Sequence, residues 1–183
     1  KFFTSHPEAR KEIFLVTKSD ARDPAGMDKL LARSLERMQT DFIDLYFVHG
    51  IGNINEMDDN VRVWAHRMKK EGKIRFIGFS THKNMESCLM GASKLGWIDG
   101  AMFSYNFRLM KKDGMKAAID ACAAAGIGLT AMKTQGGGSV RIESEKEVNM
   151  AATFLDKGFT DAQARLKAVW EDTRIACICS QMP

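Results

Sequence analysis

The chain has 183 residues, 45% of them hydrophobic and 27% charged, and a formal net charge of +4. These values are typical of a globular protein of one domain that is long enough to bury a large core. Lysines and arginines are scattered among acids, as in 33–37, so we interpret them as solvated helix faces and expect no nucleic-acid partner. No apolar stretch reaches membrane-spanning length and no signal peptide is visible, so we expect no membrane partner. A cytoplasmic location is the default expectation, although an export signal removed from the chain would not be visible.

Four cysteines show no CxxC or CxxH spacing, so we expect neither a zinc nor an iron–sulfur site. Cys122 lies in an alanine-rich helical pattern, and Cys177 and Cys179 lie in a strand-like run. We expect these residues and Cys88 to be buried reduced thiols, which favours a reducing compartment.

Short apolar runs with β-branched or aromatic residues recur along the chain. Their length and composition predict strands that are buried on both faces and are therefore parallel. The runs that we assign to strands are 13–16, 43–48, 74–79, 101–105, 127–132 and 175–178.

Helical periodicity occupies the intervals between these runs. The segment 144–173 holds two helical patterns that are separated at Gly158, with Thr160 as the expected N-cap of the second. Glycines that end helices are expected shortly before three of the strands, at Gly72, Gly96 and Gly126. Apolar stripes predict three further helices over 27–38, 61–68 and 115–123.

Strand and helix patterns alternate with a period of roughly 30 residues, which is typical of βα units. Eight such units close a TIM barrel, whereas six parallel strands could instead form an open doubly wound sheet. The absence of a GxGxxG turn argues against a dinucleotide-binding doubly wound sheet. We therefore expect an α/β fold in which residues 1–183 form a single partial (β/α)8 TIM-barrel domain, with about six of the eight strands.

Lys18 and His49 each end one of the apolar runs, and these runs are about one βα repeat apart. Active-site groups of a βα barrel lie at the carboxyl ends of its strands, so we expect both residues at one rim, on neighbouring strands. A buried rim lysine requires a carboxylate partner, and so paired it can lower the pKa of a nearby tyrosine. A neighbouring histidine can orient a carbonyl oxygen or relay a proton. A solvated lysine and an ordinary core or surface histidine are the alternatives.

Two other groups of residues follow predicted strands. His82 lies in a rim loop and is a candidate for substrate or cofactor contact, whereas His66 lies within a helical pattern and is expected at the surface. A glycine-rich loop, 136–138, follows Lys133. Such a loop offers backbone N–H groups and positive φ angles that suit a pyrophosphate, and the lysine adds charge, but a merely flexible loop would have the same composition.

Five motifs follow one another along the chain: Thr17-Lys18, Ile43-Asp-Leu-Tyr-Phe-Val-His49, Lys73-Ile-Arg-Phe-Ile-Gly-Phe-Ser80, Ser104-Tyr-Asn106 and Ala131-Met-Lys-Thr-Gln-Gly-Gly-Gly138. In this order they resemble the motifs of the aldo-keto reductase family, and the glycine run resembles its bacterial and archaeal branch. The resemblance implies a (β/α)8 barrel that binds NADPH or NADH without a Rossmann fold. It also implies hydride transfer to a carbonyl with an Asp, Tyr, Lys and His tetrad, in which Lys18 and His49 correspond to the lysine and the histidine.

The same resemblance implies a set of cofactor contacts. Ser80 corresponds to a serine that helps to hold the nicotinamide carboxamide. Thr81 and Met102 stand where many members have asparagine and glutamine, and Met132 takes the place of a tyrosine that stacks on the nicotinamide ring. A polarizable methionine can also pack against a flat ring. The expected cofactor contacts are Ser80, Thr81, Met102, Met132, Lys133, Gly136 and Gly137, and no metal ligand is expected.

The family's aspartate and tyrosine belong to the loop after the second strand, and this chain begins just before the third. We therefore expect the proton donor outside this chain, in a longer protein. The predicted function is NAD(P)H-dependent reduction of an aldehyde or ketone, with a small-molecule carbonyl compound as partner. The alternatives are a non-catalytic barrel that binds the nicotinamide cofactor as a redox sensor or scaffold, and an unrelated TIM-barrel lyase or isomerase that uses Lys18 as a Schiff-base amine. The sequence does not indicate the oligomeric state.

Overall fold

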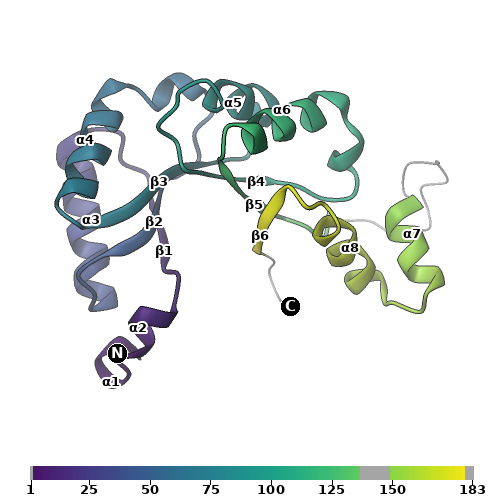
Figure 1. Ribbon diagram of the computed structural model, residues 1–183, viewed down its shortest axis with the longest axis horizontal. Helices are drawn as coiled ribbons and strands as arrows, with labels where there is room; N and C mark the ends of the chain where they lie inside the picture. Colours follow the sequence, from purple (N-terminus) through teal and green to yellow (C-terminus); the bar gives the residue numbers. More distant parts are fainter. Residues whose placement is uncertain (1, 137–148, 180–183) are drawn as a thin grey trace.

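The computed structural model describes residues 2–136 and 149–179, which form one curved sheet with helices along its outer side (Figure 1). All five strand pairs of this sheet are parallel, and the strands lie side by side in the order in which they occur in the sequence. The six strands are β1 (Val16–Ser19), β2 (Ile43–Val48), β3 (Ile74–Thr81), β4 (Gly100–Ser104), β5 (Gly128–Met132) and β6 (Ile175–Cys179).

The sequential order decides between the two architectures that the sequence allowed. A doubly wound sheet reverses its strand order at a switch point, whereas a barrel adds each new strand on the same side of the previous one. Figure 1 shows the sheet bending steadily from β1 to β6. The described strands therefore have the arrangement of a βα barrel, as predicted.

Helices connect the strands on the outer side of the sheet (Figure 1). Two short helices precede β1, and two 3-10 helices lie in loops. The α-helices are α1 (Phe2–Ser5), α2 (Ala9–Glu12), α3 (Pro24–Met38), α4 (Asp59–Lys70), α5 (Met85–Ala92), α6 (Asp113–Ala124), α7 (Asn149–Asp156) and α8 (Asp161–Trp170), and the 3-10 helices are η1 (Ile54–Glu56) and η2 (Leu109–Lys111).

The predicted helix boundaries are largely confirmed. Thr160 caps α8, because its hydroxyl accepts the N–H of Gln163 while the Gln163 side chain accepts the N–H of Thr160. Gly72 and Gly126 directly follow the C-caps of α4 and α6 with positive φ angles near 70°, which end these helices at little steric cost. Gly96 has a similar φ angle but lies in the turn after α5, which already ends at Ala92 with Ser93 as its C-cap.

The first strand was predicted too early, at 13–16 instead of Val16–Ser19. The backbone N–H of Leu15 donates to the buried carboxylate of Asp44 at 2.8 Å, so a side chain satisfies this group, although the Leu15 carbonyl still accepts from the backbone of Asp44 and Leu45. Ile13 and Phe14 are exposed. The shift places Lys18 inside β1 instead of directly after it.

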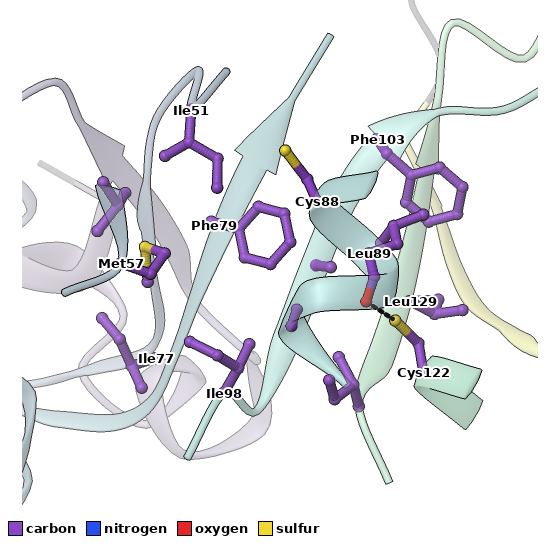
Figure 2. Packing of buried hydrophobic residues seen from close by; sticks show 14 of the residues in the cluster. Ile51, Met57, Ile77, Phe79, Cys88, Leu89, Ile98, Phe103, Cys122 and Leu129 are labelled. Atoms are coloured by element: carbon purple, nitrogen blue, oxygen red, sulfur yellow. Dashed lines mark hydrogen bonds between the residues drawn. The ribbon is translucent and has the colours of Figure 1, made fainter. Parts of the chain in front are cut away.

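The cysteines divide into two groups. Cys88 on α5 and Cys122 on α6 are both buried, and the Cys122 thiol donates across to the α5 carbonyl of Leu89 at 3.2 Å (Figure 2). Burial raises the pKa of Cys122 to about 11, so this thiol is not a nucleophile at neutral pH. Cys177 and Cys179 are exposed, and the expectation that all four are buried was therefore wrong. Both lie on β6, which pairs with only one strand among the described residues.

The two faces of the sheet differ. The outer face packs against α3 to α6 in a continuous core that includes Tyr46, Trp64, Phe79 and Phe103 (part of it in Figure 2). The inner face carries a smaller apolar cluster of Phe47, Met102 and Met132, with Leu45 packed against it. Alternation of side chains along each strand produces this division.

Glycines on β3 and β4 make room for the inner cluster. A Cβ atom at Gly78 would lie 2.7 Å from a ring carbon of Phe47, and one at Gly100 would lie 3.3 Å from Leu45. The same Cβ atom at Gly78 would lie only 2.1 Å from the backbone carbonyl oxygen of Gly100 on β4, so the close approach of these two strands requires glycine there.

Candidate active site

Lys18 points to the inner side of the sheet near its carboxyl rim. Its neighbour Ser19 faces the helices, where the hydroxyl is hydrogen-bonded to the buried hydroxyl of Tyr46. Because successive strand residues point to opposite faces, Lys18 points inward, and its side chain is exposed there. β1 pairs with β2, and Lys18 lies opposite Phe47.

His49 directly follows β2 and is half-buried at the same rim. Its Nδ1 is hydrogen-bonded to the hydroxyl of Ser80 at 2.8 Å, and the N–H of Gly50 donates to that same hydroxyl at 3.0 Å. Ser80 is fully buried near the end of β3. The serine therefore fixes the orientation of the imidazole, and a fixed imidazole presents its second nitrogen in a defined direction.

His82 directly follows β3 and joins the same group. Its Nδ1 lies 3.2 Å from the hydroxyl of Ser104, and its ring is 6.5 Å from the His49 ring and almost perpendicular to it. Burial lowers the pKa of His82, and the charges of Lys133, His49 and Lys18 lower it further. The rim thus gathers basic groups from four strands around one space, and a cationic His82 is disfavoured there.

The floor of this rim is the inner apolar cluster of Phe47, Met102 and Met132. Both methionines retain a little exposure, at 8% each, whereas the outer core residues of the same strands are completely buried. A flexible thioether side chain adapts to a flat ring placed against it. The floor and the basic rim together suit a ligand that has an aromatic part and a negative part.

Lys133 follows β5 with a φ angle of +54°, the left-handed region that non-glycine residues seldom adopt. The next residue, Thr134, is fully buried, and the carbonyl of Lys133 accepts the side-chain amide of Asn106 at 3.3 Å. The strained backbone is thus held by its neighbours, and it places the exposed Lys133 side chain near His82.

The loop that continues from Lys133 is fastened by two arginines. Arg108 donates to the carbonyl of Gly136 at 3.0 Å, and Arg165 on α8 donates to the carbonyl of Gln135 at 2.9 Å. Gly136 has a φ angle of +66°, and a Cβ atom there would lie 3.2 Å from the Phe107 ring. Gly137, the other glycine predicted to contact the cofactor, lies outside the described residues.

Thr81 is not brought together with the other predicted residues. Its hydroxyl is buried on the side of α5 and donates to the carbonyl of Lys83 at 2.7 Å. Tyr105 also points away from the rim, and its hydroxyl donates to Asp172 at 2.6 Å. Burial, followed by the bond to Asp172, raises the pKa of Tyr105 well above its usual value, so this phenol is not a proton donor tuned to neutral pH. His66 is exposed on α4, as predicted.

The sequence reasoning missed Ser104, Arg108 and Arg165. Ser104 lies at an inward position of β4, and strand alternation alone could have identified it once the strand register was known. The arginines carry no sequence signal, because their partners are backbone carbonyls of a distant loop.

In the part of the chain that the structure describes, no group of three or more His, Cys, Asp or Glu side chains could hold a metal ion. In the same part of the chain, every helix is too short or too polar to cross a membrane.

The fold of this chain belongs to the βα-barrel class, because its parallel strands follow one another in sequence order. The candidate site lies at the carboxyl ends of these strands, where a basic rim surrounds an apolar floor. Residues 1–176 match the model of the Aldo/keto reductase family, and the chain belongs to this family.

Individual relatives agree with this assignment. The chain is 33% identical over 127 residues to a glyoxal reductase from Bacillus subtilis, which covers 67% of this chain and 43% of that protein. It is 35% identical over 72 residues to a methylglyoxal reductase from Yersinia pestis, which covers 38% of this chain and 25% of that protein. The chain thus spans less than half the length of these curated relatives.

Solved structures give the same fold. An aldo-keto reductase from Bacillus halodurans in its holo form superimposes with a TM-score of 0.74 at 20% identity, over 93% of this chain and 63% of that one. A Klebsiella pneumoniae aldo/keto reductase in complex with NADP and acetate superimposes with a TM-score of 0.69 at 23% identity, over 97% of this chain and 63% of that one. The TIM-barrel fold of the family is therefore also the fold of this chain.

Proposed function

We propose that the complete polypeptide carrying this chain reduces an aldehyde or ketone to an alcohol, with hydride from a nicotinamide cofactor. The observation that supports it best is the placement of Lys18 and His49 on neighbouring strands, above a floor of Phe47, Met102 and Met132. Membership of the Aldo/keto reductase family supports the same chemistry.

His49 is proposed to bind the carbonyl oxygen. Its Nδ1 is held by Ser80, so Nε2 is the ring nitrogen available to a substrate. As negative charge develops on the oxygen, positioned donors and cations stabilise it more than they stabilise the neutral carbonyl. Lys18 and Lys133 add positive charge to this rim, and the proton is expected from a tyrosine outside this chain whose pKa Lys18 lowers.

The residues at the rim fit a nicotinamide cofactor. Met102 and Met132 offer a soft apolar surface for a flat ring, and Lys133 and the Gly136 turn offer charge and a close backbone approach to phosphate. Ser80 lies at the rim with these residues, bonded to His49, whereas Thr81 is left out of the proposed contacts because its hydroxyl is buried on the α5 side. When bound, the cofactor supplies the hydride that the chain's own residues cannot supply.

We propose NADPH before NADH, because the related Klebsiella pneumoniae structure contains NADP. For the substrate we propose small aldehydes with a neighbouring oxygen, since two relatives are named for glyoxal and methylglyoxal reduction. The cytoplasm is proposed as the location.

The test is carbonyl-dependent NADPH oxidation by the complete polypeptide, compared with a Lys18→Met variant. We expect a fall in kcat of about 10²- to 10⁴-fold, the usual contribution of a proton-transfer group, with the NADPH Kd nearly unchanged. Lys29→Met on the exposed side of α3 is the matched control and should retain full activity. Equal turnover in the wild type and the Lys18→Met variant would contradict the proposal.

A further inference from the structure

The His49–Ser80 arrangement occurs a second time, one strand further along the sheet. His49 follows β2 directly and bonds through Nδ1 to Ser80 on β3; His82 follows β3 directly and bonds through Nδ1 to Ser104 on β4. The strand register makes the two pairs equivalent. Val48 pairs with Phe79, which places His49 level with Ser80. Thr81 pairs with Phe103, which places His82 level with Ser104 in the same way.

The two imidazoles are neighbours at the rim. Their ring centroids are 6.5 Å apart and their planes are nearly perpendicular. Within the described residues, Nε2 of neither ring has a hydrogen-bond partner, and both rings have solvent access. Because a hydrogen-bonded oxygen lies about 2.9 Å from its donor nitrogen, one small molecule can reach both rings at once.

The charged neighbours keep His82 suited to binding an uncharged oxygen. Burial disfavours the cationic form of His82 most, and the charges of Lys133, His49 and Lys18 disfavour it further. A neutral imidazole that uses one nitrogen for a serine hydroxyl keeps the other as a donor or an acceptor, depending on its tautomer. The edge-to-face contact of the two rings places His82 beside the histidine that is proposed to bind the carbonyl.

We propose that His82 is a specificity residue that hydrogen-bonds a second oxygen next to the carbonyl that His49 binds. The preferred substrates are then small compounds with oxygen on two adjacent carbons. This inference rests on the proposed function, because it assigns a second contact to the substrate of that same site.

The test compares methylglyoxal with propanal, three-carbon aldehydes that differ in the second oxygen. In the complete polypeptide, His82→Ala should lower kcat/KM for methylglyoxal about tenfold, the value of one hydrogen bond of about 1.4 kcal/mol, and change propanal less than about twofold. Ser104→Ala should also lower the ratio of kcat/KM for methylglyoxal to kcat/KM for propanal, but by a smaller factor than His82→Ala. The matched control is His66→Ala on α4, which should leave both substrates unchanged.

Three outcomes would overturn the inference. Equal losses for both aldehydes would mean that His82 supports the site as a whole. A weaker NADPH Kd in His82→Ala would mean that it contacts the cofactor. Unchanged methylglyoxal kinetics would mean that it contacts no ligand.

A second measurement separates this inference from the proposed function. Histidine Cε1–H signals of the polypeptide are recorded by NMR with hydroxyacetone and with acetone, which again differ in one oxygen. A signal that is absent from His82→Ala and that moves only with hydroxyacetone supports the inference even if the wild type reduces neither aldehyde, a result that would defeat the proposed function. The lack of any such movement would overturn the role of His82 whether or not the polypeptide turns over.

Discussion

The outer and inner faces of the sheet are made by the same strands and have different composition. Phe103 and Met102 are adjacent on β4, but Phe103 lies in the outer core with no exposure and Met102 lies on the floor of the rim. The outer face gains its stability from apolar burial against helices. The inner face uses fewer apolar groups and concentrates basic side chains at one end. One face therefore carries most of the stability, and the other carries the proposed chemistry.

The largest expected effect comes from the outer face. Phe103→Ala should lower the free energy of unfolding by about 3–5 kcal/mol, because it leaves a cavity in a completely buried core. Chemical denaturation of the complete polypeptide, with and without the substitution, measures this difference in the free energy of unfolding. A cost below about 1 kcal/mol would contradict the assignment of the main core to this face.

Asp44 should give a smaller but pH-dependent effect. It is buried, and it bonds Arg10 at 2.9 Å and Arg75 at 2.7 Å. Burial alone would raise the pKa of Asp44, but the hydrogen bonds from Leu15, Arg75 and Arg10 outweigh burial and hold it below its usual value. We expect Asp44→Asn to cost about 3 kcal/mol at neutral pH, since it leaves a buried guanidinium without its counter-charge.

The sign of the pH dependence follows from that lowered pKa. Stability from Asp44 is fully present above its unfolded pKa of about 3.9 and is lost as the pH falls through the lower folded value. Denaturation from pH 7 to pH 2 should therefore show a shallower acid decline in Asp44→Asn than in the wild type. Parallel curves would contradict the depressed pKa. Asp59→Asn, at an exposed carboxylate on α4, is the control.

Met132→Ala tests the inner face directly. We expect a loss of about 2 kcal/mol in stability, at the low end for a core methionine, because the inner cluster is small. The NADPH Kd should rise by a larger factor than in Phe103→Ala, since Met132 is proposed to contact the nicotinamide ring. Isothermal titration of both variants with NADPH, under conditions in which both are folded, measures the two Kd values. Equal affinities would remove Met132 from the proposed cofactor site.

The smallest effect is expected at Gly136. Alanine at a φ angle of +66°, with its Cβ atom 3.1 Å from Asn106, should cost about 1 kcal/mol and weaken cofactor binding a few-fold. Gly52→Ala is the matched control, because a Cβ atom there would approach nothing nearer than a Glu56 carboxylate oxygen at 3.9 Å and Gly52 has no positive φ. If both variants bind NADPH equally, the loop after β5 does not depend on this turn.

Much of this arrangement could be predicted because strands and helices leave local signals. The second strand was predicted at 43–48, as observed, and Thr160 was identified as a cap from its own side chain. For α5 only an end near Gly96 was expected, and its start was missed because Asn84 begins it in a left-handed conformation without a side-chain cap. β1 was misplaced because Asp44, distant in sequence, binds the backbone of Leu15.

The site could be predicted only in part, because some of its contacts join residues that are distant in sequence. Lys18 and His49 follow from the rule that barrel chemistry lies at strand ends, and both lie at the rim. The bonds from Ser104 to His82 and from Arg108 to Gly136 depend on strand register and loop packing, which no local pattern encodes.

Each rim histidine pairs with a serine on the next strand, so the proposed activity requires the correct register between neighbouring strands. A slip of one residue between β3 and β4 would turn every side chain of one strand to the opposite face. Phe103 would then leave the core and Ser104 would leave the rim in the same event. Misregistered molecules would be unstable as well as inactive, so selection against misfolded chains would also remove molecules with a wrongly built site.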